Sequence, residues 1–251
     1  MSFCDDCFKG VTHEGTPAGK VEHIGGIECY VAKPAQDHPK DKVVLFLTDV
    51  FGIVLENNLL LADDFARNGL RTIVPDLFNG DPVPKGGFDG SVPPVSREVW
   101  HGKHGAAQIR PILDSVIATL KAEGVTRFAA TGYCFGARYV VDLALDNAIQ
   151  VSALSHPSRL VVPDDLEKYF AVSTAPLLLN TCTIDPVFPH EAQAKADEIF
   201  GEGKFEPGYR REYFDGCKHG FAVRGDMSDP IVKAGKEGAF KASVEWFLKY
   251  L

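Results

Sequence analysis

The sequence predicts an α/β fold built on a doubly wound, mostly parallel β-sheet with an N-terminal β-hairpin. Residues 43–47, Val-Val-Leu-Phe-Leu, form a continuous apolar run of the kind found in strands that are buried on both faces. Short apolar segments then alternate along the chain with segments of helical periodicity, which is typical of a parallel sheet. Near the start, Gly25-Gly26 separates two β-like segments and suits the positive φ angles of a two-residue hairpin turn.

The expected elements follow in chain order. The hairpin strands are expected at 21–24 and 27–31, and later strands at 43–47, 71–75, 127–131, 151–155, 177–181 and 209–214. Helices are expected at 56–67, 106–122, 136–145, 190–200 and from about 230 to 251. The helix at 106–122 has the clearest pattern, because its Ile, Leu and Val residues recur at helical spacing and Gly124 follows as a C-terminal stop.

The segment 79–104 breaks this alternation. Its first part is rich in proline and glycine and has no periodicity, so we expect an excursion over the surface of the sheet. Such a segment is either a functional lid or a passive connection.

Length and composition indicate a single domain over residues 1–251. The 45% hydrophobic content is enough for one large core, and the net charge of -8 argues against nucleic acid as a partner. The N-terminus has acidic residues where a secretory signal needs a positive start, and no apolar run approaches the roughly 20 residues of a membrane span. We therefore expect a cytoplasmic monomer or homodimer without a membrane partner.

A strand-turn-helix transition at Gly132-Tyr133-Cys134-Phe135-Gly136 is the strongest local signal. This is the context of the nucleophile elbow of α/β-hydrolases, in which a strained central residue projects above the sheet while glycines allow close backbone packing. The start of a helix also favours thiolate over thiol. Cys134 is therefore predicted to be a nucleophile, in preference to a buried structural cysteine.

A base and an orienting acid follow the nucleophile in the chain order that this fold uses. Asp185 comes after the strand expected at 177–181, and His219 after the strand expected at 209–214, so both side chains should emerge at the same edge of the sheet as Cys134. The other histidines are weaker candidates for the base. Some precede the core, His156 comes before the acid in the chain, and His190 begins a helix. His101 and His104 lack metal-ligand partners and fit a solvated or packing role better.

Two backbone amides are expected to form an oxyanion hole. In hydrolases of this class one N–H comes from the loop after the first central strand, here Val50, and one from the residue after the nucleophile, here Phe135.

With these residues in place, the chain resembles the dienelactone hydrolase family, and in particular its fungal branch. The resemblance covers nearly the whole chain and rests on Asp-Val-Phe-Gly at 49–52, Val-Pro-Asp-Leu-Phe at 74–78, the elbow around Cys134, Asp185 before Pro186, and His-Gly-Phe-Ala at 219–222. It implies an α/β-hydrolase fold and a Cys-His-Asp triad that hydrolyses small lactones or esters through an acyl-cysteine, without metal or organic cofactor.

Two positions depart from the family pattern. Well-known members carry Glu in the first loop, where it controls the thiol, whereas this chain has the shorter Asp49, which could equally brace the loop. The family also binds a substrate carboxylate through arginines. Arg224, five residues after His219, approximately matches one of these, and Arg97 is a candidate for the other.

Two other classes of function stay open. A thiol redox enzyme could use Cys134 or the Cys4-Asp5-Asp6-Cys7 pair, although the six scattered cysteines indicate a reduced protein without disulfides. A non-catalytic binding protein could also retain the hydrolase scaffold.

Overall fold

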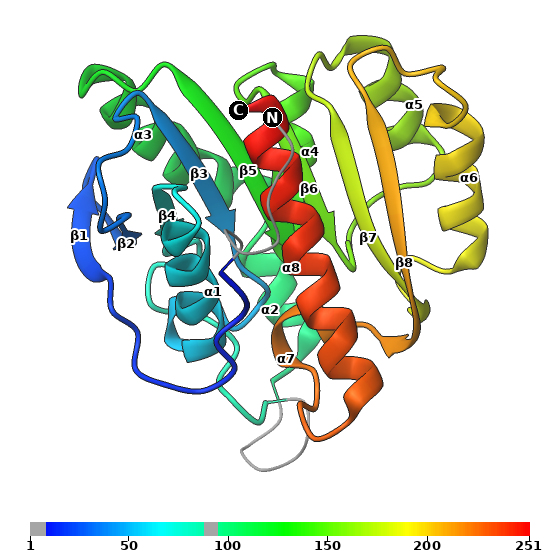
Figure 1. Ribbon diagram of the computed structural model, residues 1–251, viewed down its shortest axis with the longest axis horizontal. Helices are drawn as coiled ribbons and strands as arrows, with labels where there is room; N and C mark the ends of the chain where they lie inside the picture. The colour runs from blue at the N-terminus through cyan, green and yellow to red at the C-terminus, as the bar shows by residue number, and fades with distance from the viewer. Residues whose placement is uncertain (1–8, 88–94) are drawn as a thin grey trace.

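The computed structural model describes residues 9–87 and 95–251, and it contains the predicted doubly wound sheet (Figure 1). Its eight strands lie in the order β1-β2-β4-β3-β5-β6-β7-β8. The strands are β1 (Lys20–Ile24), β2 (Ile27–Ala32), β3 (Lys42–Leu47), β4 (Thr72–Pro75), β5 (Arg127–Tyr133), β6 (Val151–Ser155), β7 (Leu177–Ile184) and β8 (Tyr209–Lys218).

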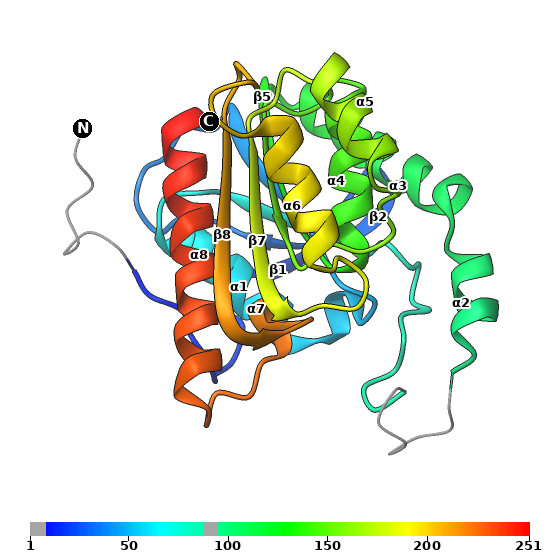
Figure 2. The same cartoon turned by 90° about the vertical axis from the view of Figure 1, so that its right-hand side faces the viewer.

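Helices cover both faces of the sheet, as Figure 2 shows nearly edge-on. On one face α1 (Glu56–Arg67) and α8 (Pro230–Tyr250) bury their apolar sides, and on the other face lie α3 (Ala106–Ala122), α4 (Phe135–Leu145), α5 (Asp164–Val172) and α6 (His190–Phe200). The two faces form two separate apolar clusters. Strand β3 contributes to both, because Leu45 and Leu47 face one cluster and Val44 and Phe46 the other. The run at 43–47 is therefore a central strand buried on both faces, as predicted.

The N-terminal hairpin is also confirmed. Gly25 and Gly26 have φ angles of 60° and 79°, and β1 pairs with β2 in antiparallel register. Strand β2 joins the main sheet through an antiparallel pairing with β4, whereas the pairings from β4 through β8 are parallel. The sheet is thus mostly parallel.

Most boundaries agree with the predictions within one residue, but three strands run further past their predicted ends and three helices were missed. Strands β5, β7 and β8 run on to Tyr133, Ile184 and Lys218 because neighbouring strands continue to pair there, across a register shift in β7 and β8. The missed helices are α2 (Arg97–Lys103), α5 and α7 (Phe221–Arg224). Helices α2 and α7 are too short for a periodic signal, and α5 buries only Leu166 and Tyr169. None of the described helices is long and apolar enough to cross a membrane.

Candidate active site

Cys134 lies in a sharp turn between β5, which ends at Tyr133, and α4, which begins at Phe135. Its backbone has φ 48° and ψ -108°, a sparsely populated conformation for a residue with a side chain. Glycines on either side allow this turn. A Cβ on Gly136 would lie 2.2 Å from the carbonyl oxygen of Leu47, and a Cβ on Gly132 would lie 2.6 Å from Cα of Ala137. The half-buried thiol therefore sits at the carboxyl edge of the sheet and at a helix N-terminus.

Asp185 and His219 meet at the same edge, after β7 and β8. Nδ1 of His219 and Oδ2 of Asp185 are 2.9 Å apart. Oδ1 of Asp185 accepts hydrogen bonds from the backbone N–H groups of Val187 and Phe188, both at 3.0 Å. The backbone N–H of His219 donates to the carbonyl of Ile184 at 2.8 Å. The carboxylate and the imidazole are thus both held in place.

His219 also interacts with Cys134, and its pKa reflects both partners. Burial alone would lower the pKa of this imidazole, but hydrogen bonds to Asp185 and Cys134 and their negative charges raise it from 6.5 to about 9. Asp185 and Cys134 therefore both favour the protonated form of His219. The structure brings together the three side chains that the sequence selected.

The two predicted amide donors lie in the loop after β3, which contains Val50, and at the start of α4, which begins at Phe135. Phe135 is the first residue of α4, so its N–H belongs to the first helical turn, where no intrahelical acceptor exists. The carbonyl of Val50 accepts a hydrogen bond from the N–H of Val83 at 2.9 Å, which fixes the orientation of that loop. Among the described residues, neither the Val50 nor the Phe135 N–H has a hydrogen-bond acceptor. Their role in an oxyanion hole stays a prediction.

Asp49 and Arg224, selected separately from the sequence, form an ion pair. Nε of Arg224 donates to Oδ2 of Asp49 at 2.7 Å, and the guanidinium lies 5.0 Å from the ring centre of Phe51. Oδ1 of the fully buried Asp49 also accepts from the Phe51 N–H and from Nδ2 of Asn58, both at 3.2 Å. Asp49 therefore braces its loop and holds Arg224 at the same time.

The loop after β6 brings two residues to the site that the sequence did not indicate. Oγ of Ser158 is 3.6 Å from Sγ of Cys134. The imidazole of His156 is fully buried, and its ring centre lies 5.0 Å from that of His219. The only sequence signal for these residues was their place after a central strand, at the carboxyl edge of the sheet.

The excursion at 79–104 is described only in part, because 88–94 lie outside the described residues, as do Cys4 and Cys7. Its second half forms α2, whose Trp100 packs against Phe78 and Phe135. His104 is buried against Trp100, which agrees with the predicted packing role. Arg97 begins this helix.

The described histidines, cysteines and carboxylates form neither a metal-ligand cluster nor a disulfide. No group of three or more His, Cys, Asp or Glu side chains there is placed to hold a metal ion. The four described cysteines are all unpaired, and burial raises the pKa of Cys29 and of Cys182 to about 12.

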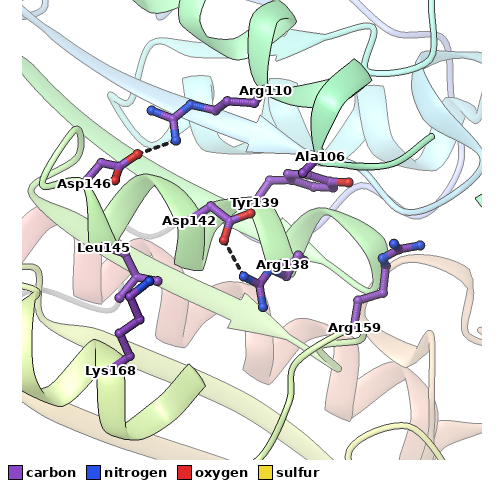
Figure 3. A pocket seen from close by; sticks show the side chains of 9 residues that line it. All are labelled: Ala106, Arg110, Arg138, Tyr139, Asp142, Leu145, Asp146, Arg159 and Lys168. Carbon is purple, nitrogen blue, oxygen red and sulfur yellow. Dashed lines mark hydrogen bonds and ion pairs between the residues drawn. The ribbon is translucent and has the colours of Figure 1, made fainter. Parts of the chain in front are cut away.

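A cavity of about 710 Å³ lies apart from the three predicted catalytic side chains, along α4 and between α3 and α5 (Figure 3). Two of its basic side chains are paired within it, Arg110 with Asp146 and Arg138 with Asp142. The lining residues are Ala106, Arg110, Arg138, Tyr139, Asp142, Leu145, Asp146, Arg159 and Lys168.

The sheet order, the elbow and the residues at the strand ends define an α/β-hydrolase fold. The model of the dienelactone hydrolase family matches residues 27–251, and the chain belongs to this family. It is thus an enzyme of the ester- and lactone-hydrolase type.

Similar proteins agree with this assignment. A hydrolase named pyvD from Aspergillus violaceofuscus is 34% identical over 98% of this chain and 96% of its own length. A protein named dienlactone hydrolase 2 from Gibberella moniliformis is 34% identical over 96% and 92%. Among solved structures, a putative dienelactone hydrolase from Klebsiella pneumoniae has a TM-score of 0.69 at 19% identity and covers 89% of this chain and 93% of its own.

Proposed function

We propose that the protein hydrolyses small carboxylic esters or lactones through an acyl-cysteine intermediate on Cys134. His219 acts as the general base and acid, and Asp185 orients it. One observation carries the proposal: a cysteine in a strained elbow stands beside a histidine whose other ring nitrogen lies 2.9 Å from a buried carboxylate. A nucleophile, a base and an orienting acid at neighbouring strand ends are the arrangement that acyl transfer requires.

The proposed reaction has two halves. In the first, the proton of the thiol moves to Nε2 of His219, the sulfur attacks the carbonyl carbon, and the leaving alkoxide departs with the proton from His219. In the second, His219 takes a proton from water, the hydroxide attacks the thioester, and the sulfur departs as thiolate with release of the carboxylic acid. For a lactone, the alcohol and the acid remain in one product.

The groups around the sulfur have distinct proposed roles. The amides of Val50 and Phe135 bind the oxyanion of each tetrahedral intermediate. Asp49 uses the Nε donor of Arg224, so the remaining guanidinium N–H groups would bind a carboxylate on the substrate.

A reduced, cytoplasmic setting suits this chemistry, because the thiol must stay free. We expect a monomer or homodimer there that binds neither nucleic acid nor membrane.

Substitution of Cys134 tests this function. We expect Cys134→Ala to abolish hydrolysis of p-nitrophenyl acetate, while mass spectrometry of the wild type should trap an acetyl group on the peptide that carries Cys134. Cys29→Ala, which removes a buried thiol on β2, should keep its activity. A folded Cys134→Ala protein with full activity would rule out the mechanism, and reversible oxidation of Cys134 without an acyl adduct would favour redox chemistry.

A further inference from the structure

The loop His156-Pro157-Ser158-Arg159 after β6 has an unusual backbone. His156 and Arg159 both have positive φ angles, 39° and 63°, although neither is glycine. Each such residue costs about 1–3 kcal/mol and persists only where its surroundings impose it. The loop contacts the base through His156, the nucleophile through Ser158 and Phe135 through Arg159, whose guanidinium lies 5.3 Å from that ring.

Ser158 is tied to Cys134 at two points. Its backbone N–H donates to the carbonyl of Cys134 at 3.1 Å, and its hydroxyl oxygen is 3.6 Å from Sγ. The N–H of Cys134 in turn donates to the carbonyl of Ser155 at 3.2 Å, so both backbone polar groups of Cys134 bind the segment from Ser155 to Ser158. The serine is nearly buried. The backbone therefore holds Ser158 beside the sulfur before any substrate binds.

His156 limits the positive charge near the base. Burial lowers the pKa of its imidazole well below the usual value, and the charges of His219 and Arg224 lower it further, so this ring is neutral. Both of its nitrogens are buried without a hydrogen-bond partner among the described residues. The proton from the thiol therefore has one nearby imidazole to occupy, that of His219.

We propose that Ser158 is a further catalytic residue, whose hydroxyl donates a hydrogen bond to the thiolate of Cys134 and favours the thiolate–imidazolium pair over the neutral pair. The inference rests on the proposed nucleophilic role of Cys134. A hydroxyl can accept from a thiol and donate to a thiolate at the same distance, but the bond to the charged form is the stronger one. No further reactant is needed, because the thiol proton moves to Nε2 of His219. The other charged and titratable groups of the site are Asp49, Asp185, His156, Arg159, His219 and Arg224.

The test measures the sulfur directly, without an ester substrate. Wild type, Ser158→Ala and Ser158→Thr are alkylated with iodoacetamide between pH 4 and 10, and mass spectrometry follows the peptide that carries Cys134. We expect the midpoint of the pH dependence to rise by about one unit in Ser158→Ala, which corresponds to roughly tenfold slower alkylation at a fixed acidic pH. Ser158→Thr, which keeps the hydroxyl, should restore most of the difference.

The matched control is Ser173→Ala, which removes a buried hydroxyl that accepts from the N–H of Ala175 at the end of α5. Its midpoint should equal that of the wild type. The role of Ser158 would be overturned if the midpoint of the pH dependence of alkylation stays unchanged or falls in Ser158→Ala. The melting temperature of this variant must then equal that of the wild type. Hydrolysis by the wild type is measured separately, so a failure of the proposed function is recognised independently of the serine.

Discussion

At the scale of single residues, the site is a set of charged groups that hold one another in place. The carboxylate of Asp185 is held by two backbone amides and holds His219 in turn. Asp49, buried and bound by two donors, holds Arg224. The sequence predicted each of these four residues from its position after a strand or from the resemblance. It did not predict that Asp49 and Arg224 bind each other, because they are 175 positions apart.

The raised pKa of His219 predicts how hydrolysis depends on pH. The imidazolium must protonate the leaving alkoxide, so kcat for an alkyl ester should fall as pH rises through about 9, where this group loses its proton. The apparent value belongs to the coupled pair of Cys134 and His219. A p-nitrophenyl ester is the matched control, because its leaving group departs without a proton and its kcat should stay level there. If kcat falls equally for both esters above about pH 9, this role of His219 is contradicted.

The ion pair between Asp49 and Arg224 predicts a loss of stability. Arg224→Ala leaves a fully buried carboxylate without its cation, so we expect the free energy of unfolding to fall by about 3 kcal/mol in urea titrations. Arg210→Ala removes an exposed arginine that pairs with Glu212 on β8, and it should cost less than about 1 kcal/mol. If the two variants lose similar amounts, the buried pair is not the stabilising contact.

At the scale of elements, the junction of β5 and α4 decides where the sulfur lies. Gly136 packs against the end of β3, so the helix starts directly beside the first central strand. The glycine pattern around Cys134 was visible in the sequence, and the close backbone approach that it predicts is confirmed. The loop after β6 carried no such pattern, since positive φ angles at His156 and Arg159 arise from contacts that the chain makes only after folding.

Substitution of the elbow glycine should therefore be severe. A Cβ at Gly136 would meet the carbonyl oxygen of Leu47 at 2.2 Å, so we expect Gly136→Ala to lower the free energy of unfolding by about 3 kcal/mol or more and to abolish hydrolysis. The same change at Gly102 on α2 meets nothing within 4 Å and should stabilise the protein by up to about 1 kcal/mol. Thermal unfolding of both variants distinguishes a steric effect from a general effect of alanine.

At the scale of the whole molecule, one sheet separates two apolar clusters, and the strands of the centre belong to both. Trp100 on α2 lies in one cluster and Trp246 on α8 in the other. Because the two clusters share the same strands, neither should survive the loss of the other. A single domain over residues 1–251 therefore stays a prediction, and the expected coupling of the two clusters can test it.

The two tryptophans allow a direct measurement of that coupling. Trp100→Phe and Trp246→Phe each leave one tryptophan as a fluorescent reporter. In each variant we expect fluorescence and circular dichroism to give the same m-value and the same urea midpoint. A fluorescence transition that clearly precedes the circular dichroism transition in either variant would indicate two units that unfold separately.

The sequence by itself determined the strands and the five longer helices in chain order, the central strand, the hairpin, the elbow at Cys134 and the strand ends that carry Asp185 and His219. These are local properties, since periodicity, glycine placement and chain order act over a few neighbouring residues. Only the tertiary structure decided that Asp49 pairs with Arg224, that His156 packs on His219 and that Ser158 lies beside the sulfur. Those contacts join segments far apart in the chain, and their distances depend on how the strand ends and loops pack at one edge of the sheet.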